Sequence, residues 1–93
     1  MGITIELPSA LRPFAGGSLA VTLDERCDTV RDALGALARH HAGVVDRVVE
    51  ETGELRRHVN VFVNGDNVRF LDGLGTPVGE GSTIIIVPSV SGG

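Results

Sequence analysis

The chain has 93 residues, 42% of them hydrophobic, and carries a net charge of −4. A chain of this length forms one small domain, which buries somewhat over ~60% of its unfolded surface and has too few residues for a deep catalytic cleft beside its core. The acidic balance argues against binding to nucleic acid or to an anionic membrane, because both require a basic face. No apolar run approaches ~18 residues and the start lacks the basic residues of a signal peptide, so we expect a cytoplasmic protein.

The first quarter of the chain predicts two strands. Apolar residues alternate with polar ones in two short runs, which is the period of a half-buried strand. A turn-rich loop at residues 12–17 joins the runs, so they are typical of a hairpin with a long connection. The apolar positions, expected to face the core, are Ile3, Ile5 and Leu7 in the first strand and Leu19, Val21 and Leu23 in the second.

One amphipathic helix follows. The segment Thr29-Val30-Arg31-Asp32 matches a capping box, in which the threonine accepts a backbone N–H and the acid reaches back. Helical apolar spacing continues to His41, and Gly43 is expected to form a left-handed cap. The valines that follow suggest another helical turn or two before Thr52-Gly53, although an irregular segment fits them equally well. His40 and His41 point about 100° apart on a helix, so they do not converge on one metal ion.

The second half of the chain predicts three more strands. Val59, Val61 and Val63 alternate with polar residues or phenylalanine, a tight turn at 64–67 leads to a short strand at 68–70, and a β-branched run at 83–87 ends at Pro88. The glycine-rich segment 73–81 has the wrong glycine spacing for a phosphate loop and contains a proline. We interpret it as a loop that holds Leu74 and Val78 against the core.

This element order indicates an α+β protein with a β-grasp, or ubiquitin-like, fold. We expect a mixed sheet of four to five strands, with one main helix packed on one face. The first two strands form one hairpin, the next two form another, and the last strand pairs between them. Residues 1–88 would form the domain, and residues 89–93 would be a flexible Gly-Gly tail.

Strand alternation predicts an apolar patch on the sheet face away from the helix. If the valines of strand 59–63 and Ile84 and Ile86 face the helix, then Phe62, Ile85 and Val87 face away from it. Exposed apolar clusters of this kind mark surfaces that bind partners. The alternative is that Phe62 merely covers the stems of its neighbours.

The tail ends at Gly92-Gly93, which have no Cβ and can pass through a channel too narrow for side chains. A carboxylate is a poor electrophile until it is activated. Such a tail therefore implies a partner enzyme that uses ATP to form an acyl-adenylate, with this protein as substrate and without catalytic residues of its own. The alternative is a frayed terminus.

The single cysteine, Cys27, cannot form an internal disulfide, and acidic neighbours oppose the formation of its thiolate. We interpret it as an inert thiol and not as the carrier of any sulfur. All eight basic residues are arginines, so the chain cannot accept a modifier through a lysine amine, and arginine suits pairing with carboxylates at an interface.

Several segments together resemble the MoaD/ThiS family of ubiquitin-like sulfur carriers, and within it the actinobacterial carriers of cysteine biosynthesis. The resemblance covers nearly the whole chain and ends at the terminal Gly-Gly. The segments that carry it are Leu11-Arg12-Pro13, Asp28-Thr29-Val30, residues 59–70, Gly73-Leu74-Gly75-Thr76-Pro77 and residues 87–93.

The resemblance implies that Gly93 is adenylated and then converted to a thiocarboxylate, with Gly92 as its spacer and Val90 and Ser91 in the partner's tunnel. It implies an adenylyltransferase/sulfurtransferase partner, a sulfur-accepting enzyme, for which we expect a cysteine synthase, and a metal-dependent peptidase. ATP, pyridoxal phosphate and zinc would belong to those partners, and the carrier itself would bind no cofactor or metal. Phe62, Ile85 and Val87 would dock, with Arg12 pairing with partner carboxylates.

Other functions are compatible with the same sequence. Serine at position 89 replaces the small apolar residue or proline that is common there, which leaves the partner open. The chain could be the small subunit of molybdopterin synthase, a sulfur donor for a secondary metabolite, or a protein modifier joined to lysines through Gly93. It could also be a β-grasp interaction module without tail chemistry.

Overall fold

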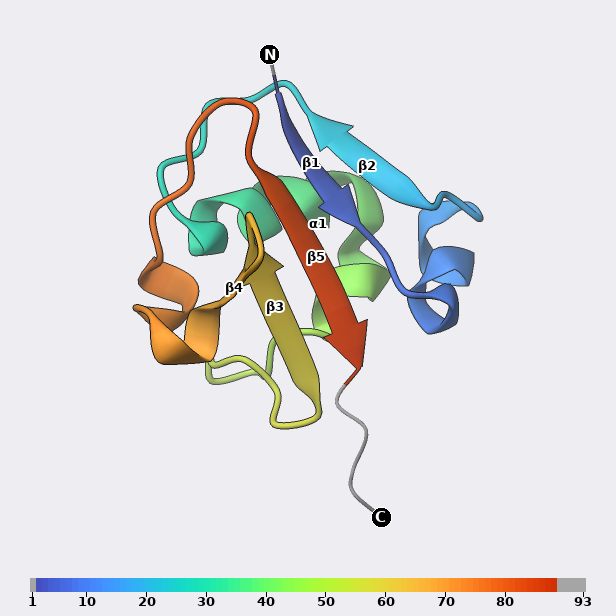
Figure 1. Ribbon diagram of the computed structural model, residues 1–93. Coiled ribbons are helices and arrows are strands. Elements are labelled where there is room, and N and C mark those ends of the chain that lie inside the picture. The colour runs from blue at the N-terminus through green and yellow to red at the C-terminus, as the bar shows by residue number, and fades with distance from the viewer. Residues whose placement is uncertain (1, 89–93) are drawn as a thin grey trace.

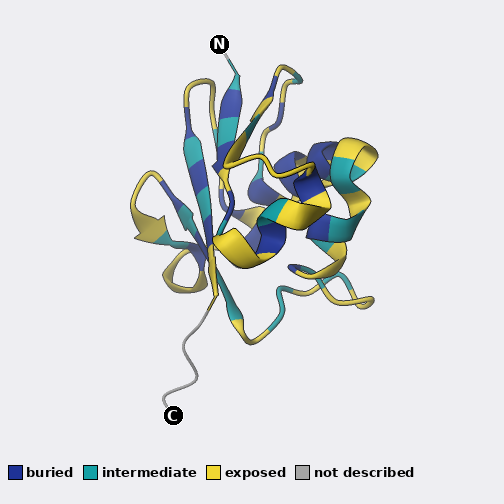
Figure 2. Ribbon diagram, turned by 90° about the vertical axis from the view of Figure 1, so that its right-hand side faces the viewer, coloured by how far each residue is buried: buried dark blue, intermediate teal, exposed yellow. Residues whose placement is uncertain are grey.

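The structure is a computed structural model and describes residues 2–88 (Figure 1). One mixed sheet of five strands carries a single α-helix on one face, as Figures 1 and 2 show. The predicted ubiquitin-like β-grasp fold is confirmed. In chain order the elements are β1 (Ile3–Glu6), the 3₁₀ helix η1 (Ser9–Ala15), β2 (Ala20–Leu23), α1 (Val30–Asp46), β3 (Val59–Val63), β4 (Asp66–Asn67), the 3₁₀ turns η2 (Val68–Phe70) and η3 (Gly73–Gly75), and β5 (Thr83–Pro88).

The last strand lies in the middle of the sheet. The strand order is β2-β1-β5-β3-β4, in which β5 runs parallel to β1 and antiparallel to β3. The two hairpins therefore meet only through β5, as the sequence predicts. Because β1 and β5 are parallel, both strands end at the same end of the sheet.

The core fills the space between the sheet and α1. Ile84 and Ile86 of β5 are buried between inward residues of the flanking strands, and α1 contributes Leu34 and Leu37. Burying one such side chain contributes about 1.5–3 kcal/mol of transfer free energy. The expected inward positions of β1 and β5 are confirmed, as are those of Val61 and Val63.

The helix begins where the capping box predicts and ends later than Gly43. The Thr29 side chain accepts a hydrogen bond from the Asp32 N–H at 3.2 Å, and Asp32 Oδ2 accepts one from the Asp28 N–H at 3.2 Å. The expected left-handed cap at Gly43 is wrong, because Gly43 lies inside α1 and has no positive φ. Non-helical dihedral angles at His41 (φ −141°, ψ 63°) kink α1, but the helix resumes and continues to Asp46, and it buries Val44 in this last part. A Cβ at position 43 would lie 3.4 Å from the Phe14 ring, so this glycine permits close packing of that ring.

Two segments differ from their predicted secondary structure. The expected loop at 12–17 belongs largely to η1, whose Leu11 and Ala15 fill this end of the core. Leu19, expected to face inward, is 65% exposed, because β2 begins only at Ala20.

The segment after β3 also departs from its prediction. A two-residue turn with positive φ at Asn64 and Gly65 leads into β4, which is only two residues long. The short strand expected at 68–70 is instead the turn η2, because the Val68 side chain is buried in the core. The following loop holds Leu74 and Val78 against the core, as predicted.

Within the described residues 2–88, no helix is both long enough and apolar enough to cross a membrane.

We predict that Ile84→Ala lowers the free energy of unfolding by about 2–5 kcal/mol, because it leaves a cavity where the two hairpins meet. Urea unfolding measures this loss. Leu19→Ala is the matched control and should change the free energy by less than about 0.5 kcal/mol, because Leu19 is mostly exposed. Equal urea midpoints for the two variants would contradict the described core.

Candidate functional site

The predicted tail residues Val90, Ser91, Gly92 and Gly93 lie outside the described residues, as does the expected tail segment 89–93. The described chain ends at Pro88, which closes β5 and pairs with Val59 at the start of β3. The site is therefore built from what surrounds this end of β5.

An apolar patch lies on the sheet face that α1 does not cover. Phe62 pairs directly with Ile85 across β3 and β5, and Asn60 pairs with Val87 one step nearer to Pro88. Phe62 and Ile85 are half-buried, and Val87 is 36% exposed. We call Phe62, Ile85 and Val87 the sheet patch. The structure brings these three predicted residues together on one surface beside the end of β5.

A polar network borders the sheet patch on the β4 side. Asn60 Oδ1 accepts hydrogen bonds from Asn67 Nδ2 at 3.4 Å and from Arg69 Nε at 3.2 Å. Arg69 Nη2 also donates to the backbone carbonyls of Val59 and Arg56, both at 2.7 Å. Because β4 pairs only with Phe62 and Val63, the Arg69 side chain binds the part of the β3 edge that has no strand beside it.

Sequence reasoning did not find this network. Strand alternation places Asn60 on the same face as Phe62, so its position could have been read from the pattern. The role of Arg69 could not, because the carbonyls that it binds lie 10 to 13 residues away along the chain and meet it only in the folded state.

The last predicted docking residue, Arg12, lies on the other side of β5. It belongs to η1, which follows β1, and its Nε donates to the Leu7 carbonyl at 3.1 Å. Leu7 directly follows the last residue of β1, so Arg12 is held at the end of the sheet toward which β1 and β5 both run. Within residues 2–88, no carboxylate lies within 4 Å of its guanidinium, and that group can pair with an external anion.

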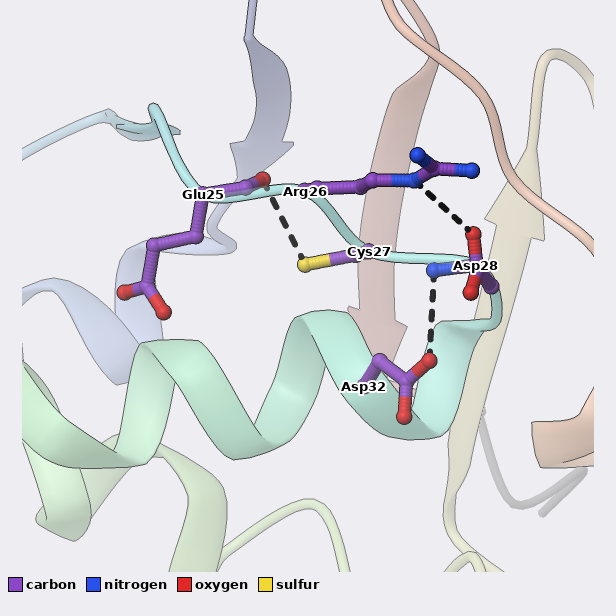
Figure 3. Close-up of polar contacts among 5 residues, drawn as sticks. All are labelled: Glu25, Arg26, Cys27, Asp28 and Asp32. Atoms are coloured by element: carbon purple, nitrogen blue, oxygen red, sulfur yellow. Dashed lines mark hydrogen bonds and ion pairs between the residues drawn. The ribbon is translucent and has the colours of Figure 1, made fainter.

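Cys27 lies at the opposite end of the sheet. Figure 3 shows it in the segment before α1, with its thiol directed toward the Glu25 carbonyl. It follows β2, whose Leu23 pairs with Ile3 at the start of β1, whereas Pro88 lies beyond the end of β1. The thiol is buried, and its Sγ lies 3.7 Å from the Glu25 carbonyl. Burial raises the pKa of the Cys27 thiol, and the nearby carboxylates of Asp32 and Glu25 raise this pKa further.

The other titratable groups show no clustering that would hold a metal. Within the part of the chain that the structure describes, no three His, Cys, Asp or Glu side chains gather around one point. The ion pairs among these residues are Arg26 with Asp28, in the segment before α1, and Arg39 with Glu25, which joins the middle of α1 to that segment.

The fold and the sheet patch define a ubiquitin-like β-grasp protein that presents one face of its sheet beside the end of its central strand. The chain belongs to the ThiS family, which matches residues 5–93. The predicted resemblance to this family is confirmed.

The relatives are small carrier and modifier proteins. The chain is 35% identical to the sulfur carrier protein CysO of Mycobacterium tuberculosis, with both chains covered completely. Its structure matches a chain of the Amycolatopsis orientalis BexX/CysO complex at a TM-score of 0.87 and 37% identity, over 98% of this chain and 99% of the matched chain. It also matches SAMP1 of Haloferax volcanii at a TM-score of 0.81 and 36% identity, with both chains fully covered. The expectation of a carrier protein and not an enzyme is confirmed by these relationships.

We predict that Cys27 reacts slowly with iodoacetamide in the folded protein. Its raised pKa leaves less thiolate at a given pH, and burial blocks the reagent. The folded protein should therefore be alkylated more slowly than the urea-unfolded protein, and its rate should reach half-maximum at a higher pH. Mass spectrometry at timed intervals measures both rates, and an equal or faster rate in the folded state would contradict the inert thiol.

Proposed function

We propose that this protein is a sulfur carrier whose terminal glycine, Gly93, is converted to a thiocarboxylate. The observation that carries the proposal is the sheet patch of Phe62, Ile85 and Val87 beside the end of β5, the strand that leads to Gly92-Gly93. A carrier needs a docking surface close to its reactive end. The full-length similarity to CysO carriers supports the same function.

The chemistry has two steps on a partner enzyme. The Gly93 carboxylate attacks the α-phosphate of ATP, which gives an acyl-adenylate and releases pyrophosphate. A sulfur donor then attacks the acyl carbon and displaces AMP, which leaves a thiocarboxylate. A thioacid is more acidic than a thiol, so it is ionised and nucleophilic at neutral pH without a general base. Gly92 serves as a spacer, and Val90 and Ser91 thread the tunnel of the enzyme.

We propose cysteine biosynthesis as the pathway, because the relatives that match over their whole length include sulfur carrier proteins named CysO. A cysteine synthase would accept the sulfur and a metal-dependent peptidase would release the product. Pyridoxal phosphate and zinc belong to these partners, ATP belongs to the activating enzyme, and the carrier binds no cofactor itself. In docking, the sheet patch meets an apolar surface and Arg12 pairs with a carboxylate of the partner.

The intact mass of the protein tests the proposal. After incubation with ATP, a sulfur source and the adenylyltransferase of the host, we expect a mass gain equal to the replacement of one oxygen by sulfur, mapped to Gly93. The variant lacking Gly93 should show no gain but should keep the same fold by circular dichroism. An unchanged mass of the wild-type chain, with an enzyme shown to charge another carrier, would refute the function.

The docking role of the sheet patch is a separate prediction. Val87→Asp places a charge in a desolvated apolar contact and should weaken binding to the adenylyltransferase by about tenfold or more. Thr22→Asp, on the same sheet face but two strands away, is the matched control and should bind as the wild type does. Calorimetric titration measures both affinities, and equal affinities would remove the sheet patch from the interface.

A protein modifier is the second candidate function, favoured by the match to SAMP1, a small archaeal modifier protein. In that case the activated Gly93 carbonyl is attacked by a lysine amine of a target protein, which forms an isopeptide bond and releases the activating group. This chain has no lysine and cannot build polymers of itself through that bond. Conjugates in a host lysate that disappear on deletion of Gly93 would support this function over sulfur transfer to a small molecule.

A further inference from the structure

One phenylalanine is left almost fully exposed. Phe14 is 39% exposed and has the Arg47 guanidinium 3.5 Å from its ring centre, and Phe62 is half-buried in the sheet patch. Phe70, the last residue of η2, is 86% exposed, and the adjacent Leu71 is 49% exposed. We call Phe70 and Leu71 the η2 knob. An aromatic side chain can bury about 150–250 Å² in a contact, so leaving it in water forgoes a large stabilisation.

The backbone under the η2 knob is held firmly. Val68 anchors the turn in the core, the Arg69 N–H donates to Asn67 Oδ1 at 2.9 Å, and the Leu71 N–H donates to the Val68 carbonyl at 3.0 Å. The Arg69 side chain ties the same turn to β3 through the carbonyls described above. A side chain presented on such a fixed turn loses little backbone entropy on binding, which is a property of interface anchors.

The η2 knob lies on the β4 side of the sheet patch, next to the polar network of Asn60, Asn67 and Arg69. Asn67 pairs directly with Phe62, and η2 begins at the next residue. Figure 1 shows η2 and η3, in orange, beside β3 and β4 at the side of the sheet away from β2. A stable protein interface buries about 800 Å² on each partner, which is more than three partly covered side chains can supply. The η2 knob supplies further exposed apolar surface on this side of the sheet.

We infer that the η2 knob is a second anchor for the activating enzyme, with Phe70 inserted into an apolar pocket on that enzyme. The inference rests on the proposed function and extends its interface. The activating enzyme carries out adenylation and then sulfur transfer at the same carboxylate, so the carrier domain must stay bound or rebind between the two steps. An anchor outside the sheet patch keeps the domain in place while the terminal carboxylate reacts.

The test compares Phe70→Ala with the wild-type chain in titrations with the adenylyltransferase. Loss of an aromatic anchor should weaken binding about 10- to 30-fold, and the KM for the carrier should rise by the same factor while kcat is unchanged. Phe70→Leu should retain most of the affinity. Leu19→Ala, which removes an exposed leucine beside β2, is the matched control and should bind like the wild type.

Three outcomes decide the inference. Weaker binding by Phe70→Ala, with an unchanged thermal midpoint and a normal control, supports it. Affinity within twofold of the wild type overturns it, and so does a change only in sedimentation, which would assign the η2 knob to a second copy of the chain. The proposed function is tested separately by the intact mass of the wild-type carrier. It fails if that carrier gains no sulfur, whatever the effect of Phe70→Ala.

Discussion

The structure depends on the insertion of β5 between β1 and β3. Neither hairpin contacts the other without this strand, because β1 and β3 each pair with β5 on their inner sides. Ile84 and Ile86 lie in the core between the sheet and α1, so the same strand takes part in sheet pairing and in core packing. The pairs between β1 and β5 join residues about 80 positions apart, and closing so long a loop costs conformational entropy that core burial must offset.

The same strand links the fold to the proposed chemistry. Its inward residues build the core, and its outward residues, Ile85 and Val87, form part of the sheet patch. The two roles share one backbone because strand side chains alternate between faces. The sheet patch is thus rigidly connected to the end of β5, while Cys27, buried at the opposite end of the sheet, is separated from it.

Arginine in this chain acts mainly as a donor to backbone carbonyls. Arg12, Arg31, Arg47, Arg56 and Arg69 each donate to at least one carbonyl where a regular element ends or a turn lies. The planar guanidinium suits this task because its several N–H groups reach more than one acceptor. At β3, Arg69 supplies hydrogen-bond donors to the part of the strand where β4 stops pairing, and it thereby protects this strand edge. The same side chain binds Asn60 in the polar network beside the sheet patch.

The sequence by itself determined the main strands, the helix and the capping at its start, the β-grasp order and the outward position of Phe62, Ile85 and Val87, because these follow from local capping chemistry and from alternation along each strand. Only the tertiary structure decided the end of α1, the exposure of Leu19 and the conversion of 68–70 into η2, since each depends on which apolar residue reaches a shared core. The Asn60–Arg69 network and the exposed Phe70 likewise needed the fold. A local pattern cannot show that distant carbonyls will meet one guanidinium, or that no neighbour will cover one ring.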